Sequence, residues 1–347
     1  MINKHSHRKD EHVSLAIHTQ NNKKNDFNEI RFVPNTLPEV DFNEVNLNTN
    51  FANIDFEWPF YIEAMTGGSE YTKKLNDKLS RVAKRTNIAM ASGSESVAIK
   101  DSSLADSFSI IRKNNPNGII FSNLGAHHNI DNIKKAITLL NANLIEIHVN
   151  SVQEIIMPEG DRDFHWIDNL KKIIKEINIP IIVKEVGFGM DYKSICKLKD
   201  IGVKYINIGG NGGTNFAKIE NERRTKDKST GFEELFDWGF STVESLLETK
   251  KINDSSMQFV AAGGIKSPLD VIKSLYLGAD LVGIAGYFLN ILIKEDEDYL
   301  VEVIKEWQNQ LKSIFTILGV KNITELRNAD VIYSEKIINF KKQRNIK

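Results

Sequence analysis

The sequence predicts an α/β fold, specifically a (β/α)8 barrel with an N-terminal arm and a C-terminal helical extension. Short apolar and β-branched runs recur about eight times, and segments with helical periodicity separate them. Near-continuous apolar strands are typical of parallel sheets that are buried on both faces, and repeated strand–helix alternation is typical of a barrel. The length of 347 residues also fits, because such a barrel takes about 250 residues plus extensions. A doubly wound open sheet is the structural alternative.

The first 50 residues differ in texture from the rest of the chain. They are polar and rich in Asn and charge, so we expect residues 1–50 to form an irregular arm and residues 51–347 to form one barrel domain. Helical periodicity is clear over residues 71–86, where apolar side chains share one face. The eight predicted strands cover residues 59–65, 88–92, 118–123, 144–150, 179–186, 205–208, 258–262 and 281–285.

After the sixth strand we expect a charged loop over residues 220–228 and a helical part over 232–249. A charged tail after the last strand contains a further helix over 298–318.

Composition excludes several classes of protein. Forty-five Lys and Arg residues balance 46 Asp and Glu residues, which gives no general electrostatic attraction to nucleic acid or to anionic lipid. The one cysteine, Cys196, cannot form an intrachain disulfide, and this fits a reducing compartment. The N-terminus has no apolar signal segment, and the longest uncharged apolar stretch is too short to span a bilayer. We therefore expect a cytoplasmic protein without a membrane or nucleic-acid partner.

Barrel enzymes build their active sites from the C-terminal ends of the strands, so that end selects candidate residues before any motif is considered. Polar side chains and glycines concentrate there in this sequence. Gly212-Gly213-Thr214, Gly263-Gly264 and Ala285-Gly286 follow the last three strands. Glycine lets backbone N–H groups approach an anion at this place in a barrel, so we expect a phosphate site.

These residues, taken with other segments in the same order, make the chain resemble the type 2 isopentenyl-diphosphate isomerases, which are flavin-dependent barrels. The resemblance covers most of the chain, from about Arg8 to the region after the eighth strand. The matching segments are RKDEH (8–12), IRFV (30–33), AMTGG (64–68), GS (93–94), SNLGA (122–126), IHVNSVQE (147–154), MPEGDR (157–162), VKEVGFG (183–189) and GGTNF (212–216).

The resemblance implies that residues 51–347 form an FMN-binding catalytic domain and that the protein moves a double bond within a five-carbon diphosphate. A proton is added at one carbon and removed from another, and reduced FMN takes part as acid or base. NADPH is implied only as the reductant of the flavin, and Mg2+ as the partner of the diphosphate. The resemblance also implies a homo-oligomer, tetramer or octamer.

Site residues follow from the same resemblance. Gln153, His148 and Asn150 are expected to be catalytic, and Lys184 is expected to place a cation beside the flavin ring. A structural histidine is the alternative for His148, and an ion pair with a neighbouring carboxylate is the alternative for Lys184. The expected cofactor-binding residues are Met65, Thr66, Gly67, Ser94, Asn123, Lys184, Thr214, Gly263, Gly264, Ala285 and Gly286.

The diphosphate and its metal need ligands of a different kind. Glu154 is the expected metal ligand, because Mg2+ takes one or two protein carboxylates together with substrate phosphate oxygens. The arm residues Arg8 and Lys9 are expected to close over the diphosphate. The expected substrate-binding residues are Arg8, Lys9, Ser94, Glu95, Ser96 and Gln153, whereas His127-His128 and Arg223-Arg224 are expected to be surface or loop residues.

Three other functions are weighed. A barrel with a cysteine nucleophile, as in nucleotide dehydrogenases, needs Cys in a strand-end loop, whereas Cys196 lies in a helical segment expected over 193–198. A hydroxyacid oxidase shares the phosphate loops but needs a late His–Arg pair, and no His follows His165 in this chain. A flavin- or phosphate-binding barrel without activity is the non-enzymatic alternative, and the presence of Gln153 and Glu154 argues against it.

Overall fold

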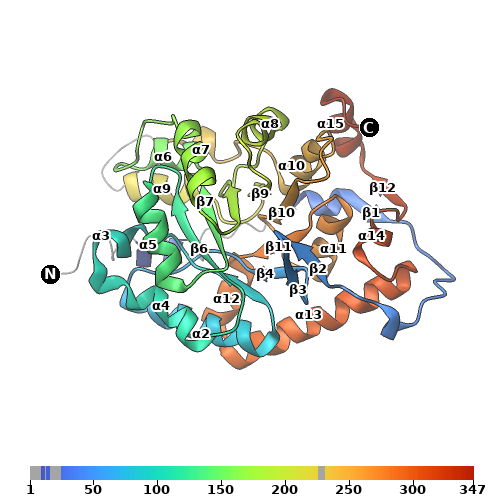
Figure 1. Cartoon of the computed structure of the whole chain (residues 1–347). Coiled ribbons are helices and arrows are strands. Elements are labelled where there is room, and N and C mark those ends of the chain that lie inside the picture. The colour runs from blue at the N-terminus through green and yellow to red at the C-terminus, as the bar shows by residue number, and fades with distance from the viewer. Residues whose placement is uncertain (1–8, 12, 16–24, 226–230) are drawn as a thin grey trace.

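The structure is a computed structural model that describes residues 9–11, 13–15, 25–225 and 231–347 (Figure 1). Eight parallel strands close into a barrel in which β11 pairs back onto β4. This confirms the predicted (β/α)8 barrel and excludes the open sheet. The strands are β4 (Phe60–Ile62), β5 (Ala89–Ala91), β6 (Ile120–Gly125), β7 (Leu144–His148), β8 (Ile181–Lys184), β9 (Tyr205–Asn207), β10 (Gln258–Ala262) and β11 (Leu281–Ile284).

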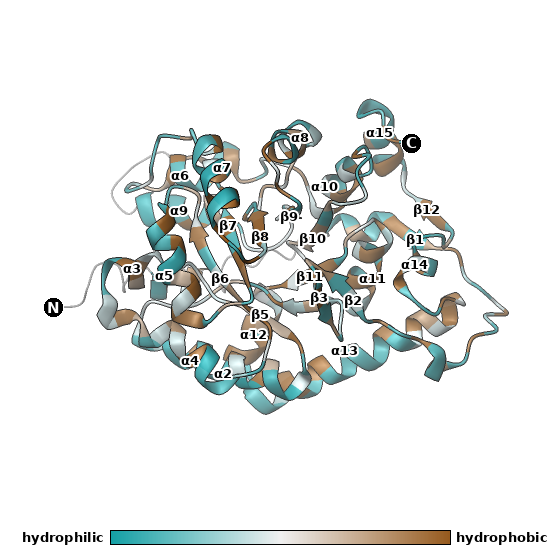
Figure 2. Ribbon diagram, viewed as in Figure 1, coloured by the Kyte–Doolittle hydropathy of each residue, from teal (hydrophilic) through white to brown (hydrophobic). Residues whose placement is uncertain are grey.

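Helices surround the barrel, and their apolar faces pack against it (Figures 1 and 2). In α2 (Glu70–Thr86), Leu75, Leu79 and Val82 are buried, as the sequence periodicity predicts, and a capping box between Ser69 and Thr72 starts the helix. The other helices around the barrel are α3 (Ser96–Lys100), α4 (Asp106–Asn114), α5 (Ile130–Leu140), α6 (Ser151–Ile156), α7 (Ile167–Glu176), α8 (Tyr192–Asp200), α9 (Phe216–Thr225), α10 (Thr242–Thr249), α11 (Pro268–Tyr276) and α12 (Gly286–Lys294).

A β-hairpin closes the N-terminal end of the barrel. It consists of β2 (Thr49–Phe51) and β3 (Ile54–Phe56), and Gln258 at the start of β10 hydrogen-bonds its backbone at Asn50 and Ala52. The Phe56 ring meets the ring of Phe121 edge to face, with centroids 6.2 Å apart. Because apolar side chains fill this end, a ligand cavity is left to the opposite, C-terminal end.

The segments that flank the barrel pack together on its outside. A 3-10 helix (Asp26–Glu29) leads into β1 (Ile30–Phe32), which pairs antiparallel with β12 (Val331–Tyr333). The segment expected as an irregular arm therefore holds regular structure at residues 26–32, 42–44 and 49–50, and the rest of residues 25–50 is irregular. The C-terminal extension is helical, as predicted, and consists of α13 (Glu297–Leu318), α14 (Ile323–Leu326) and α15 (Glu335–Gln343) around β12. Among the described residues, no helix has the length and apolar character needed to cross a membrane.

Two expectations after the sixth strand need correction. The part of the expected charged loop that the structure describes, residues 220–225, belongs to α9, and Glu220 in it is buried; residues 226–228 lie outside the described residues. The helix expected over 232–249 is divided into a short 3-10 turn and α10, because Gly239 has φ +94° and Ser241 begins α10 with a capping box.

Candidate active site

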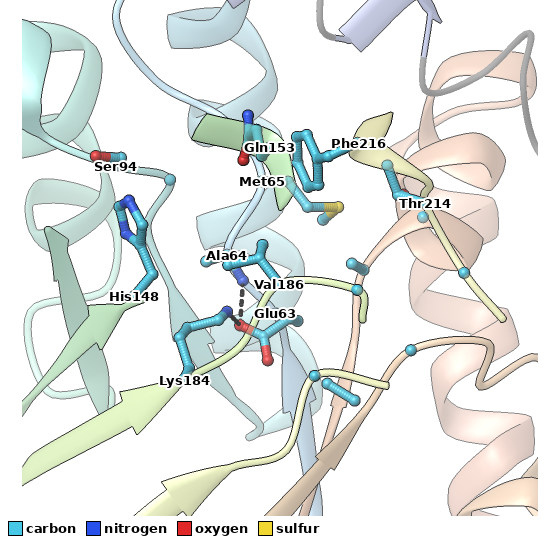
Figure 3. A pocket seen from close by; sticks show the side chains of 18 of the residues that line it. Glu63, Ala64, Met65, Ser94, His148, Gln153, Lys184, Val186, Thr214 and Phe216 are labelled. Carbon is cyan, nitrogen blue, oxygen red and sulfur yellow. Dashed lines mark hydrogen bonds and ion pairs between the residues drawn. The ribbon is translucent and has the colours of Figure 1, made fainter. Parts of the chain in front are cut away.

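A cavity of about 790 Å³ lies at the C-terminal ends of the strands. Its size falls in the range of small-molecule sites. Ser94 and His148 lie on one side of it and Thr214 on the other, with Gln153, Met65 and Phe216 between them (Figure 3). The cavity therefore has two ends of different chemistry, one formed by strands β5–β7 and the other by strands β9–β11.

Glycine backbone forms the second end. Gly212 and Gly213 after β9 lie against Gly263 and Gly264 after β10, and a Cβ on Gly213 would come within 2.8 Å of the Gly264 nitrogen. Gly263 and Gly264 have φ of +103° and +76°, which side chains rarely adopt. Together with the start of α12 at Gly286, these loops present backbone at close range to the cavity. The arrangement fits the phosphate group of FMN.

Lys184 lies under the cavity in a cluster of buried charges. Its Nζ donates to Glu63 Oε1 at 2.7 Å and to Glu146 Oε2 at 3.2 Å, and the Tyr61 hydroxyl lies within hydrogen-bond distance of both carboxyl groups, 2.8 Å from Glu63 and 3.0 Å from Glu146. Asn207 Nδ2 adds a bond of 2.7 Å to Glu63. The ion pair that the sequence left open as an alternative for Lys184 is therefore present, and Lys184 also lines the cavity (Figure 3).

The three ionisable groups differ in their titration. Burial, with the like charge of Glu63, raises the pKa of Glu146 to about 7. Burial also opposes ionisation of Glu63, but the attraction of Lys184 outweighs it and leaves the pKa of Glu63 below its ordinary value. Burial disfavours the charged form of Lys184, and the two carboxylates overcome this and raise its pKa. One ammonium faces two carboxylates, so below about pH 7 Glu146 holds the proton that balances the cluster.

Asn123 joins this cluster to the first end of the cavity. Its Nδ2 donates to Glu146 Oε2 at 3.0 Å, so its Oδ1 accepts from His148 Nδ1 at 2.9 Å. The His148 ring therefore turns Nε2 toward the cavity as an acceptor. Burial, with nearby cations, lowers the pKa of His148 well below its ordinary value and keeps the ring neutral.

Gln153 is held by a residue that sequence reasoning missed. Its Nε2 donates to Glu220 Oε1 at 2.9 Å, and Glu220 in turn pairs with Arg223, which also contacts Glu159 at 2.7 Å. Asn150 caps α6 by accepting from the Gln153 backbone N–H at 2.9 Å. The amide of Gln153 is thus fixed at the cavity wall.

Most of the predicted site residues line the cavity. They are Lys9, Met65, Ser94, Ser96, Asn123, His148, Gln153, Glu154, Lys184, Thr214, Gly263, Gly264, Ala285 and Gly286. Arg8 lies outside the described residues.

Four predicted site residues do not line the cavity. Thr66 donates its hydroxyl to Asn76, and Gly67 makes room for the ring of Phe108. Asn150 is buried as the helix cap. Glu95 is buried against Ser92 and the backbone of Asn123, and burial raises its pKa to about 8.

His127 and His128 lie in the loop after β6, as expected, and His127 is exposed. His127 lines the cavity, and His128 is buried with 5% of its surface exposed. The sequence gives no sign that His127 lines the cavity or that His128 is buried, because both depend on how the loop after β6 folds against the barrel.

No group of three or more metal-ligating His, Cys, Asp or Glu side chains occurs among the described residues. Glu154 lines the cavity and accepts the Asp161 backbone N–H at 2.8 Å, with Glu159 and Asp161 also in the lining. A single carboxylate of this kind fits Mg2+, which usually keeps waters and takes further oxygens from a phosphorylated substrate.

Comparison with known proteins gives two kinds of match. The family model described as FMN-dependent dehydrogenase matches residues 125–333. The chain is 47% identical to the isopentenyl-diphosphate delta-isomerase of Latilactobacillus sakei, over 98% of this chain and 97% of the relative. It is 45% identical to that of Limosilactobacillus reuteri over 100% of both chains, and 44% identical to that of Lactococcus lactis over 98% of both.

Solved structures show a likeness of fold. A mutant flavocytochrome b2 with pyruvate bound superposes with a TM-score of 0.68 at 19% identity, over 92% of this chain and 82% of that chain. A mandelate oxidase with (S)-2-phenylpropionate gives 0.60 at 12% identity, over 93% and 90%.

Proposed function

The chain belongs to the isopentenyl-diphosphate delta-isomerase family, and on this premise we propose that it interconverts isopentenyl diphosphate and dimethylallyl diphosphate in isoprenoid biosynthesis. The observation that carries this proposal is the two-ended cavity. A glycine cradle, formed by Gly212, Gly213, Gly263 and Gly264, is suited to a flavin phosphate and lies at one end. Hydroxyl, imidazole and ammonium groups lie at the other.

FMN is the cofactor, and reduced FMN supplies the acid–base group of the reaction when it is bound. The loops at Gly212–Thr214, Gly263–Gly264 and Ala285–Gly286 would hold its phosphate. Lys184, with Asn123 and Met65 nearby in the lining, would face its ring. We assign NADPH only the initial reduction of the flavin, because the reaction has no net redox change.

The residues of the chain position the substrate and keep water out. Gln153 cannot ionise, so its role is to orient the five-carbon group through a fixed amide. His148 presents an unprotonated Nε2 to the substrate end. The apolar side chains of Met65 and Phe216 flank the space between the two ends and exclude water from it (Figure 3).

The arm belongs to the substrate site in this proposal. Lys9 lines the cavity and donates from Nζ to the Ser94 carbonyl at 3.2 Å, which joins residues 9–11 to the loop after β5. We further propose a cytoplasmic homo-oligomer, a tetramer or an octamer, from the family resemblance.

The direct test is conversion of isopentenyl diphosphate by the purified protein with FMN and Mg2+ after anaerobic reduction, followed by NMR. Formation of dimethylallyl diphosphate supports the proposal. Absence of conversion in reduced protein whose flavin absorption returns on reoxidation would overturn it.

Glu154→Gln should reduce magnesium-dependent turnover strongly while flavin stays bound, because the change keeps the shape and removes the charge that a hard cation requires. Steady-state rates over a magnesium titration measure this, with Glu302→Gln on exposed α13 surface as the matched control. Normal rates in the variant at ordinary magnesium would exclude Glu154 as the ligand.

Arg8→Ala and Lys9→Ala should each raise KM by about tenfold to a hundredfold, because charge-assisted hydrogen bonds are worth roughly 1.5–3 kcal/mol. A five-carbon group offers little apolar surface, so the diphosphate must provide most of the binding. The flavin spectrum should not change. Lys134→Ala on exposed α5 is the control. An unchanged KM in both arm variants would contradict the assignment.

A further inference from the structure

The histidine pair after β6 lies beside the substrate end of the cavity. The rings of His127 and His128 are in contact at a tilt of 35°, with centroids 4.3 Å apart. His127 lies at the rim and lines the cavity, whereas His128 is buried behind it. Gly125 makes room for this arrangement, because a Cβ there would come within 2.8 Å of His127 Nδ1 and 3.1 Å of His148 Nε2. Two imidazoles therefore approach the same point of the cavity wall.

A hydrogen-bond chain runs from the buried ring to the cavity. Asn132 Nδ2 can only donate, so His128 Nδ1 accepts at 3.2 Å and the ring proton lies on Nε2. His128 Nε2 then donates to the Ser96 hydroxyl at 2.8 Å, and the Ser96 and Ser94 hydroxyls lie 2.9 Å apart, where either can donate to the other. When Ser96 donates, the proton of Ser94 is left for an acceptor outside this chain of hydrogen bonds.

The groups around this chain of hydrogen bonds favour the binding of an anion. Lys9 bonds the carbonyl of Ser94, and Lys100 at the end of α3 lines the same part of the cavity. The charge of Asp161 raises the pKa of His127, and the charge of Lys100 lowers it. Thr214, which directly follows Gly212 and Gly213, lies across the cavity from Ser94 and His148 (Figure 3), so an anion here is distinct from the flavin phosphate.

We propose that His127 is a substrate-binding residue that donates an N–H to the diphosphate, and that His128 is a positioning residue that aims the Ser96 and Ser94 hydroxyls at the same group. This inference rests on the proposed function for the identity of its ligand. It adds neutral donors to the cations of the arm, and neutral donors hold an oxygen in a fixed direction where a lysine supplies only charge.

The test uses the FMN-loaded protein and inorganic diphosphate as the probe, with binding measured by calorimetry and KM for isopentenyl diphosphate measured separately. His127→Ala should weaken diphosphate binding and raise KM by about tenfold, whereas kcat and the flavin spectrum change little. His127→Gln should recover part of the affinity because its amide also donates. His165→Ala removes an exposed histidine outside the cavity lining and is the matched control.

Ser96→Ala tests the buried chain without removing a ring from the core. It should weaken diphosphate binding several-fold at an unchanged melting temperature, which a purely structural role would not do. Wild-type affinity and KM in both His127→Ala and Ser96→Ala would overturn the inference even if the protein is an active isomerase. A protein that binds diphosphate through His127 but does not isomerise would overturn the proposed function and leave the anion site standing.

Discussion

Protein that carries oxidised FMN should show background isomerisation only, and anaerobic reduction of the same sample should raise the rate by several orders of magnitude. In the proposed mechanism a proton is added at one carbon and another is removed with no change of oxidation state, and the bound flavin would supply an acid–base group that only its reduced ring provides. NMR of the products before and after dithionite reduction measures the difference, and the flavin absorption spectrum shows the redox state of each sample.

The same experiment separates the isomerase from the oxidases that share its fold. A 2-hydroxy acid oxidase uses oxidised flavin as its electron acceptor, so it would bleach the flavin when it is given such an acid. No His follows His165 in this chain, which leaves the late histidine of that chemistry without a counterpart. Full isomerase activity in flavin-free or oxidised protein would contradict the assigned role of FMN.

Local signals were enough to predict the barrel and the cavity wall. Each strand is a short apolar run with Gly, Ser, Asn or Thr at its end or shortly after it, and barrel geometry gathers those ends at one face. Ser94, Gln153 and Thr214 could therefore be placed together although they are far apart in the chain. The family resemblance then separated their proposed roles.

The buried partners could not be predicted in this way, because they depend on which strands face each other inside the closed barrel. Glu63 and Glu146 interrupt two apolar strand runs, and this was the one sequence signal of a buried charge cluster. Glu220 gave no such signal, since it lies in a charged segment that is helical and buried on one side. His127 was missed because its position depends on the space above Gly125.

The pH dependence of stability should report the proton on Glu146. The pKa of Glu146 is about 7 in the folded protein and near the ordinary 4.5 after unfolding, so between these values the folded state holds a proton that the unfolded chain has lost. The free energy of unfolding therefore falls as pH rises through this window. Glu63, with its lowered pKa, contributes stability that is lost only as pH falls below 4.5.

Glu146→Gln should flatten the fall in melting temperature between pH 5 and pH 7, because the amide keeps the shape and does not titrate. Glu95 and Glu185, whose burial raises their pKa values to about 8, act in the same direction and should leave a smaller slope in the variant. Thermal denaturation at a series of pH values gives both curves. Equal slopes in wild type and variant would show that Glu146 is not the group that titrates.

Lys184→Met should abolish isomerisation and destabilise the protein strongly. The change leaves Glu63 and Glu146 buried without their cation, and loss of one partner of a buried ion pair costs about 3–5 kcal/mol. The side chain also lies where it would face the flavin ring, so we expect turnover to fall at least a hundredfold and flavin to bind more weakly. Flavin titration, thermal denaturation and the isomerase assay measure the three effects.

The double variant Lys184→Met/Glu63→Gln separates the structural part of this effect from the functional part. Removing one carboxylate together with the ammonium leaves Glu146 as a neutral acid that can still bond Tyr61 and Asn123, so most of the lost stability should return. Activity should stay absent, because no cation is restored beneath the cavity. If the double variant regains both stability and turnover, Lys184 serves only to neutralise Glu63, and the charge that acts on the flavin must come from another residue in the cavity wall.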